Sequence, residues 1–143
     1  MGDTAYDAHS PQWEAMFRLN VVTAQHAIQA VVPRFLAQRR GAIVNVGAMS
    51  AREGQAAMSA YCAAKSAVMR LTESLAKELR AQGINVNAVL PSIIDTPRNR
   101  LDMPDADFAA WVKPHDLANV ICFLASDAAT AIHGALIPVV GLS

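Results

Sequence analysis

Tyr61 and Lys65 stand four positions apart in the stretch SAYCAAKSAV (residues 59–68), in which nearly every other residue is small. At this spacing the two side chains lie on the same side of a helical turn. An ammonium close to a phenol favours the phenolate and lowers the pKa of the tyrosine, which suits a group that exchanges a proton near neutral pH. By its spacing alone, the pair is more typical of a boundary tyrosine beside a lysine whose stem covers apolar surface.

The apolar periodicity of the chain predicts three long helices that alternate with three short strands. Ser10 followed by Pro11 is typical of a helix start, and Pro33 should kink or end the first helix. Gly83 stands where a glycine often ends a helix. The expected helices cover about 13–36, 58–81 and 114–127, with a short one at 105–111; the expected strands cover 42–46, 84–90 and 135–140; loops cover 1–9, 47–57 and 91–104.

Strands that are joined by long helices must be parallel, with right-handed crossovers and helices on both faces of the sheet. The sequence therefore predicts an α/β fold in a single domain, residues 1–143, built on a doubly wound parallel sheet of about three strands with flanking helices. Ligands of such sheets bind beyond the carboxyl ends of the strands. Tyr61 and Lys65 begin the helix that follows the first strand, so we expect them to border that crevice.

Charge and composition exclude several classes of function. Lys and Arg together number 12, as do Asp and Glu, so the net charge is near zero. The chain therefore lacks the positive charge that is typical of proteins that bind nucleic acids. The two cysteines form no Cys-x-x-Cys motif and the four histidines are scattered, so we expect neither a redox pair nor a metal site. Polar residues and a proline interrupt the most apolar stretch, 117–140, which argues against a membrane span. The N-terminus is too polar for a signal peptide, and we expect a cytoplasmic protein.

In order, spacing and residue type, GAIVNV (41–46), AYCAAKSAVMRLTESLAKEL (60–79) and GINVNAVLPS (83–92) resemble the short-chain dehydrogenase/reductase family, over nearly the whole chain from Trp13 onward. This resemblance implies a partial Rossmann fold and an NADH- or NADPH-dependent reduction of the C=O or C=N bond of a small molecule. It implies that Tyr61 is the general acid, and that Lys65 lowers its pKa and holds the nicotinamide ribose. Asn20, which by itself predicts only a bent helix, would order a water behind Lys65.

The same resemblance implies a loop that contacts the carboxamide of the nicotinamide. The matching residues are Pro91, Ser92, Ile94 and Thr96. Ser92 replaces the glycine that is usual in the family. Thr96 followed by proline is also typical of an ordinary helix start, and both interpretations can hold together.

Ala48 stands where the family usually has an active-site serine, thirteen residues before Tyr61. A methyl group cannot donate a hydrogen bond to a substrate carbonyl. Ser50 is two positions away and would take that place only if the loop slipped. The stretch LPSIIDTPRNRLDMPDADFAAW (90–111) resembles dihydropteridine reductase and its bacterial relatives, a subgroup that also has alanine in this loop. That likeness implies chemistry with Tyr and Lys but without the serine, and it leaves the substrate open.

The seven glycines, at 2, 41, 47, 54, 83, 134 and 141, form no glycine-rich turn that could cradle a pyrophosphate. The chain therefore resembles the C-terminal portion of a reductase, and we expect the isolated chain to be impaired as an enzyme. The choice between NADH and NADPH stays open. The alternative is a catalytically inactive fragment that serves only as a self-associating α/β module. The apolar helices also favour a homo-oligomer, either a dimer or a tetramer.

Overall fold

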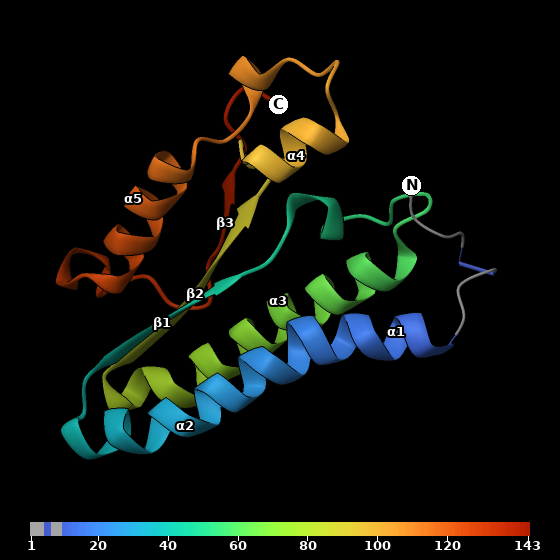
Figure 1. The fold of residues 1–143 in the computed structure, drawn as a ribbon. Coiled ribbons are helices and arrows are strands. Elements are labelled where there is room, and N and C mark those ends of the chain that lie inside the picture. The colour runs from blue at the N-terminus through green and yellow to red at the C-terminus, as the bar shows by residue number, and fades with distance from the viewer. Residues whose placement is uncertain (1–4, 7–9) are drawn as a thin grey trace.

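In the computed structural model, which describes residues 5–6 and 10–143, one parallel sheet carries helices on both of its faces (Figure 1). The strands are β1 (Gly41–Val46), β2 (Ile84–Pro91) and β3 (Leu136–Val139), and β2 lies between the other two. Both pairs of strands are parallel, with Ile43 opposite Val86 and Val89 opposite Ile137. This arrangement confirms the predicted α/β class with three parallel strands and flanking helices.

The sheet is buried most completely along its central strand. Ile84, Val86, Ala88 and Val89 of β2 are 0% exposed, as expected for a parallel strand that is covered on both faces. One apolar cluster joins β1 and β2 to α2 (Thr23–Gln38) and α3 (Ser59–Leu79). A second cluster joins the other face of the sheet to α5 (Pro114–Ala125). The sheet is therefore held between two helical layers, which Figure 1 shows on either side of the strands.

The helical segment before β1 has an irregular turn at residues 18–22, whereas the sequence predicted one at Pro33. It consists of α1 (Ser10–Phe17), a π-helical turn (Arg18–Val22) and α2, and it continues through Pro33 to Gln38. The helix therefore does not end at Pro33, which lies inside α2. Pro33 is exposed, so water can bond the carbonyl group that the proline leaves without a donor. The expected loop at 1–9 lies largely outside the described residues.

Helix α3 ends as its sequence predicts. A short 3₁₀ turn (Arg80–Gln82) follows it, and Gly83 then takes a left-handed conformation with φ of 77°. A Cβ atom on Gly83 would lie 2.4 Å from the carbonyl oxygen of Arg39. Both the backbone angle and this close approach require glycine, and the turn passes the chain directly into β2.

The region between β2 and β3 holds more helix than expected. Helix α4 (Pro97–Asp102) lies inside the predicted loop 91–104, because Thr96 accepts a hydrogen bond from Asn99 N–H and caps it. The short helix expected at 105–111 is only a 3₁₀ turn (Phe108–Ala110), and α5 ends at Ala125. Within the described residues, no helix combines the length and the apolar composition that crossing a membrane would require.

Candidate functional site

Tyr61 and Lys65 lie one turn apart at the beginning of α3, and Lys65 Nζ is 5.9 Å from the centre of the Tyr61 ring. The ammonium donates a hydrogen bond to the carbonyl oxygen of Val46 at 3.0 Å. Val46 is the last residue of β1. Helix α3 therefore places the ammonium at the carboxyl end of the sheet, the edge at which ligands of this fold class bind.

Burial dominates the electrostatics of this pair. It raises the pKa of Tyr61, with a further contribution from the neighbouring Cys62, and it lowers the pKa of Lys65. The predicted lowering of the Tyr61 pKa by Lys65 is therefore wrong for this structure. The reason is that both side chains are half-buried, and loss of water disfavours the charged form of each. The phenol consequently keeps its proton through the neutral pH range.

Asn20 lies in the π-helical turn at 18–22, where the backbone N–H of Thr23 bonds the carbonyl of Arg18. Its side-chain nitrogen donates to the carbonyl oxygen of Met16 at 2.9 Å. The turn contacts α3, the helix that carries Lys65. π-helical turns often mark functional positions because they shift the helical register locally. The sequence predicted a bent helix at Asn20, and the structure has a π-helical turn at that residue.

The four residues predicted to contact the nicotinamide lie at the carboxyl end of β2. Pro91 is the last residue of that strand, and Ser92 N–H donates to the carbonyl oxygen of Val139 at 3.1 Å. Ile94 forms a parallel bridge with Val112. Thr96 begins α4. The structure thus brings this loop and Lys65 to the same edge of the sheet, although they are 26 or more positions apart in the chain.

Ala48, at the position where a serine is usual in the family, directly precedes the 3₁₀ turn at 49–51. It is 4% exposed and belongs to an apolar cluster against which Tyr61 also packs. Two bonds from α3 fix the loop that follows it: Cys62 Sγ donates to the carbonyl of Ser50 at 3.3 Å, and Ser66 Oγ donates to the carbonyl of Ala51 at 2.8 Å. The slip that would bring Ser50 to the place of Ala48 would have to break these bonds.

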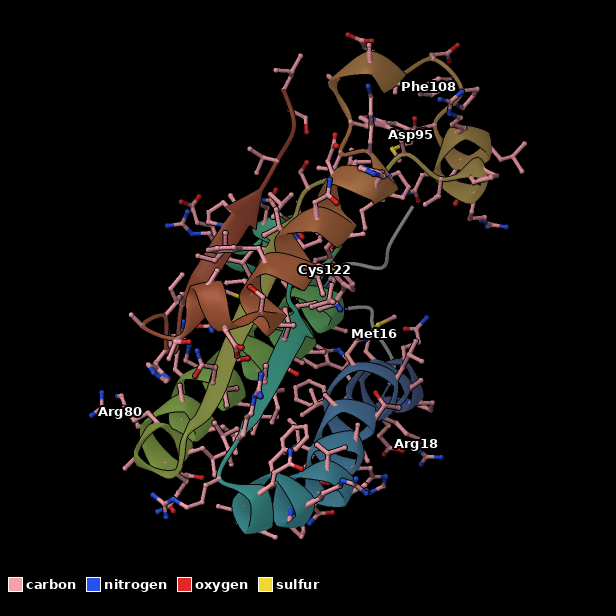
Figure 2. The ribbon with its side chains drawn as sticks, turned by 90° about the vertical axis from the view of Figure 1, so that its left-hand side faces the viewer. Met16, Arg18, Arg80, Asp95, Phe108 and Cys122 are labelled. Atoms are coloured by element: carbon pink, nitrogen blue, oxygen red, sulfur yellow. The ribbon has the colours of Figure 1, made fainter. Side chains whose placement is uncertain are left out.

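A clamp of Asp95, Arg100 and Phe108 was not predicted. Arg100 donates two hydrogen bonds to the carboxylate of Asp95, at 2.6 and 2.8 Å, and its guanidinium lies 4.7 Å from the centre of the Phe108 ring. Figure 2 shows Asp95 and Phe108 together at one end of the molecule. The hydrogen bonds from Arg100 lower the pKa of Asp95. The spacing of five between the charges lies outside the pairs expected on a helix, so no sequence signal indicated the clamp.

Comparison with known proteins identifies the family of the chain. The profile of the short chain dehydrogenase family matches residues 2–106. The chain is 34% identical to the 3-oxoacyl-(acyl-carrier-protein) reductase of Thermotoga maritima, over 90% of this chain and 56% of that enzyme.

Two solved structures have the same arrangement of elements. The gluconate 5-dehydrogenase of Burkholderia cenocepacia, in complex with NADP and tartrate, has a TM-score of 0.90 at 25% identity and covers 99% of this chain. The carveol dehydrogenase of Mycobacterium avium, in complex with NAD, has a TM-score of 0.86 at 29% identity and covers 97%. This chain spans 59% of each of those two chains.

None of these three relatives is named for a pterin, so the dihydropteridine-reductase-like subgroup stays a prediction. The family itself rests on more than a local motif. Its profile covers well over half of the chain, including the π-helical turn, the beginning of α3 and the loop after β2. The chain belongs to the short chain dehydrogenase family.

Proposed function

We propose that this chain carries the proton-donating side of an NAD(P)-dependent oxidoreductase that reduces the C=O or C=N bond of a small molecule. The observation that carries the proposal is the pair of Tyr61 and Lys65 on one turn of α3, with Lys65 bonded to the carboxyl end of β1. The NADP and NAD in the two solved relatives support a nicotinamide cofactor. Because one relative holds NADP and the other NAD, titration of this chain with NADPH and NADH must decide which cofactor it binds.

Tyr61 is the proton donor in this proposal. Its raised pKa keeps the phenol protonated at neutral pH, which is the form that a general acid needs. When bound, a nicotinamide cofactor supplies the hydride. The substrate oxygen or nitrogen then gains negative charge, and Tyr61 Oη donates its proton to that atom.

The ammonium of Lys65 has further N–H groups with which it can bond a ribose. An ammonium carries three N–H groups, and the carbonyl oxygen of Val46 takes one of them. The other two can donate to hydroxyl oxygens of the ribose. Asn20, on the turn that packs against α3, is proposed to order a water behind this ammonium. Pro91, Ser92, Ile94 and Thr96 are proposed to contact the carboxamide.

Replacement of a single hydroxyl group tests the role of Tyr61. Tyr61→Phe should remove most of the turnover and leave cofactor affinity nearly intact. Tyr6→Phe makes the same change at a tyrosine that is 86% exposed, and it should change neither quantity. Cofactor affinity is measured by the fluorescence of NADH and NADPH, and turnover by their loss of absorbance with a panel of ketones and imines. An unchanged rate in Tyr61→Phe would remove Tyr61 as the acid.

The same titration separates the enzyme from the predicted alternative, a catalytically inactive and self-associating α/β module. Binding of either cofactor in the micromolar range, with turnover, supports the reductase. Absence of both, together with a dimer or tetramer in sedimentation, would favour the module. A quinonoid dihydropterin belongs in the substrate panel, because turnover of that compound would place the chain in the dihydropteridine-reductase-like subgroup.

A further inference from the structure

A hollow of about 450 Å³ lies between the segment 49–55 and the carboxyl ends of β2 and β3. This volume is within the range of small-molecule sites. Its apolar lining comes from Met49 and Val140. Its polar lining consists of Ser50, Arg52, Glu53, Gln55, Ser92 and Ser143.

The polar side chains that line this hollow differ in whether they already form hydrogen bonds within the protein. Ser92 Oγ lies 2.8 Å from Ser143 Oγ and donates to the carbonyl of Val140 at 3.0 Å. By contrast, the side chains of residues 50, 52, 53 and 55, which also line the hollow, form no hydrogen bond or ion pair with any residue that the structure describes. The segment 50–55 therefore presents polar groups that are free to bond a ligand.

The chemistry of these four side chains favours a neutral ligand with hydroxyl groups. Ser50 and Gln55 can both donate and accept hydrogen bonds, whereas Arg52 only donates and Glu53 only accepts. Arg52 and Glu53 carry opposite charges, so the four side chains have no net charge to attract an ion of either sign. A hydroxyl group both donates and accepts, and it can bond any of these four side chains.

Tyr61 does not itself line the hollow, but the segment 49–55 connects the hollow to the surroundings of Tyr61. Met49 packs on the same apolar cluster as Tyr61, and the carbonyl of Ser50 accepts a hydrogen bond from Cys62, the residue after Tyr61. Ser92, which also lines the hollow, follows Pro91 at the end of β2. A substrate whose carbonyl lies at Tyr61 can therefore extend into this hollow.

We propose that the hollow binds the part of the substrate remote from the reacting carbonyl, that the substrate is a small, neutral, hydroxylated carbonyl compound, and that Ser50 Oγ bonds one of its hydroxyl groups and so determines specificity. This inference rests on the proposed reductase function of the same site. A site built to bond a hydroxyl rejects an analogue without one, because its own polar groups then lose their water without gaining a partner.

Two ketones of the same shape test the inference. The compounds 4-hydroxycyclohexanone and 4-methylcyclohexanone differ only in carrying a hydroxyl or a methyl group at the ring carbon farthest from the carbonyl. Their dissociation constants are measured by calorimetry on the whole chain, with and without NADPH, and their kcat/KM values by cofactor oxidation. The hydroxy ketone should bind about tenfold more tightly than the methyl ketone.

Three variants assign this preference to one hydroxyl. Ser50→Ala should weaken binding of the hydroxy ketone and bring the ratio of the two dissociation constants close to one. Ser50→Thr keeps a hydroxyl and should retain most of the preference. Ser74→Ala makes the matched change at an exposed serine in the second half of α3 and should leave the ratio unaltered. Circular dichroism checks that each variant is folded.

Failure of this inference can be told from failure of the proposed function. Equal or tighter binding of the methyl ketone, or an unaltered ratio in Ser50→Ala, overturns the inference even if both ketones are reduced. If neither ketone is reduced but the hydroxyl preference is present and depends on Ser50, the hollow is a polar binding site as inferred and the reductase function fails.

Discussion

Lys65 Nζ donates a 3.0 Å hydrogen bond to the backbone carbonyl of Val46 and thereby ties the second turn of α3 to the last residue of β1. This bond connects a helix and a strand that are adjacent in the chain but are separated by the loop at 47–58. It fixes the ammonium at the edge of the sheet where a ligand binds. The predictions below test this contact and the loops around it.

Lys65→Met should separate function from stability. Removal of the ammonium should weaken cofactor binding and turnover together, because the proposed ribose contact is lost. Burial lowers the pKa of Lys65 from its usual 10.5, so the charged form destabilises the folded state below the lowered pKa. That penalty disappears as the pH rises through the lowered pKa toward 10.5. The variant should therefore be at least as stable as the parent at pH about 7, with a difference that shrinks at alkaline pH.

Denaturant titrations of the parent and the Lys65→Met variant from neutral to alkaline pH measure this difference. Lys77→Met is the control, because Lys77 is exposed in the last turn of α3 and its replacement should alter neither cofactor binding nor the pH dependence. Normal cofactor affinity in Lys65→Met would contradict the ribose role.

Arg100→Gln should loosen the segment 95–111, because it removes both hydrogen bonds to Asp95 and the contact with Phe108. We expect faster cleavage by proteases within this segment and a raised KM for the carbonyl substrate. Arg98→Gln is the matched control, since among the described residues Arg98 pairs just with Asp102, in an exposed ion pair one turn along α4. Equal proteolysis of the two variants would show that the clamp does not order the segment.

The clamp also has a predicted pH dependence. Arg100 lowers the pKa of Asp95 from its usual 3.8, so the carboxylate form stabilises the clamp at pH values above 3.8. This stabilisation is lost as the pH falls through the lowered pKa. Protection of the segment against an acid protease should accordingly persist down to the usual carboxylate range and fail only below it.

Ala48→Ser should be tolerated and should extend activity to further carbonyl compounds. Ala48 precedes the 3₁₀ turn at 49–51 in an extended conformation, a position at which a serine hydroxyl can bond free backbone N–H groups. Ala51→Ser is the contrasting control, because Ala51 is 6% exposed within the same apolar cluster and a hydroxyl buried without a partner costs about 1–3 kcal/mol. Denaturation curves and kcat/KM values measure both effects. A larger stability loss in Ala48→Ser than in Ala51→Ser would show that residue 48 serves packing alone.

Gly83→Ala should destabilise the chain by about 2 kcal/mol or more, since the new Cβ atom adds a steric clash to a left-handed backbone. The Cβ atom would lie 2.4 Å from the carbonyl oxygen of Arg39, and that oxygen belongs to the backbone and cannot turn away. Gly54→Ala is the control, because nothing lies within 4 Å of a Cβ atom there. Similar unfolding midpoints for the two variants would contradict the requirement for glycine at 83.

Much of the fold could be predicted because local patterns and burial agree along the chain. The run from Ile84 to Leu90 is apolar enough to identify a central parallel strand, and Gly83 marks the end of the helix before it. Whether a helix continues through a proline, as α2 does at Pro33, depends on whether water can reach the carbonyl that the proline frees, and the exposure of Pro33 is a tertiary property. The start of α4 could be predicted from Thr96 and Pro97, but six residues carry too little periodicity to predict how far a helix extends beyond that start.

The sequence by itself determined that a tyrosine and a lysine share one turn of a helix after a buried strand, because that depends only on spacing and periodicity. It also determined the family likeness, which lies in the order of those residue types. Tertiary structure alone decided the direction of the Tyr61 pKa, because burial disfavours the charged phenolate. It alone brought Arg100 onto Asp95 and Phe108, and Ser50 and Ser92 to the same hollow. These relationships join residues at spacings that no helix or strand imposes, so only the packing of loops onto the sheet could create them.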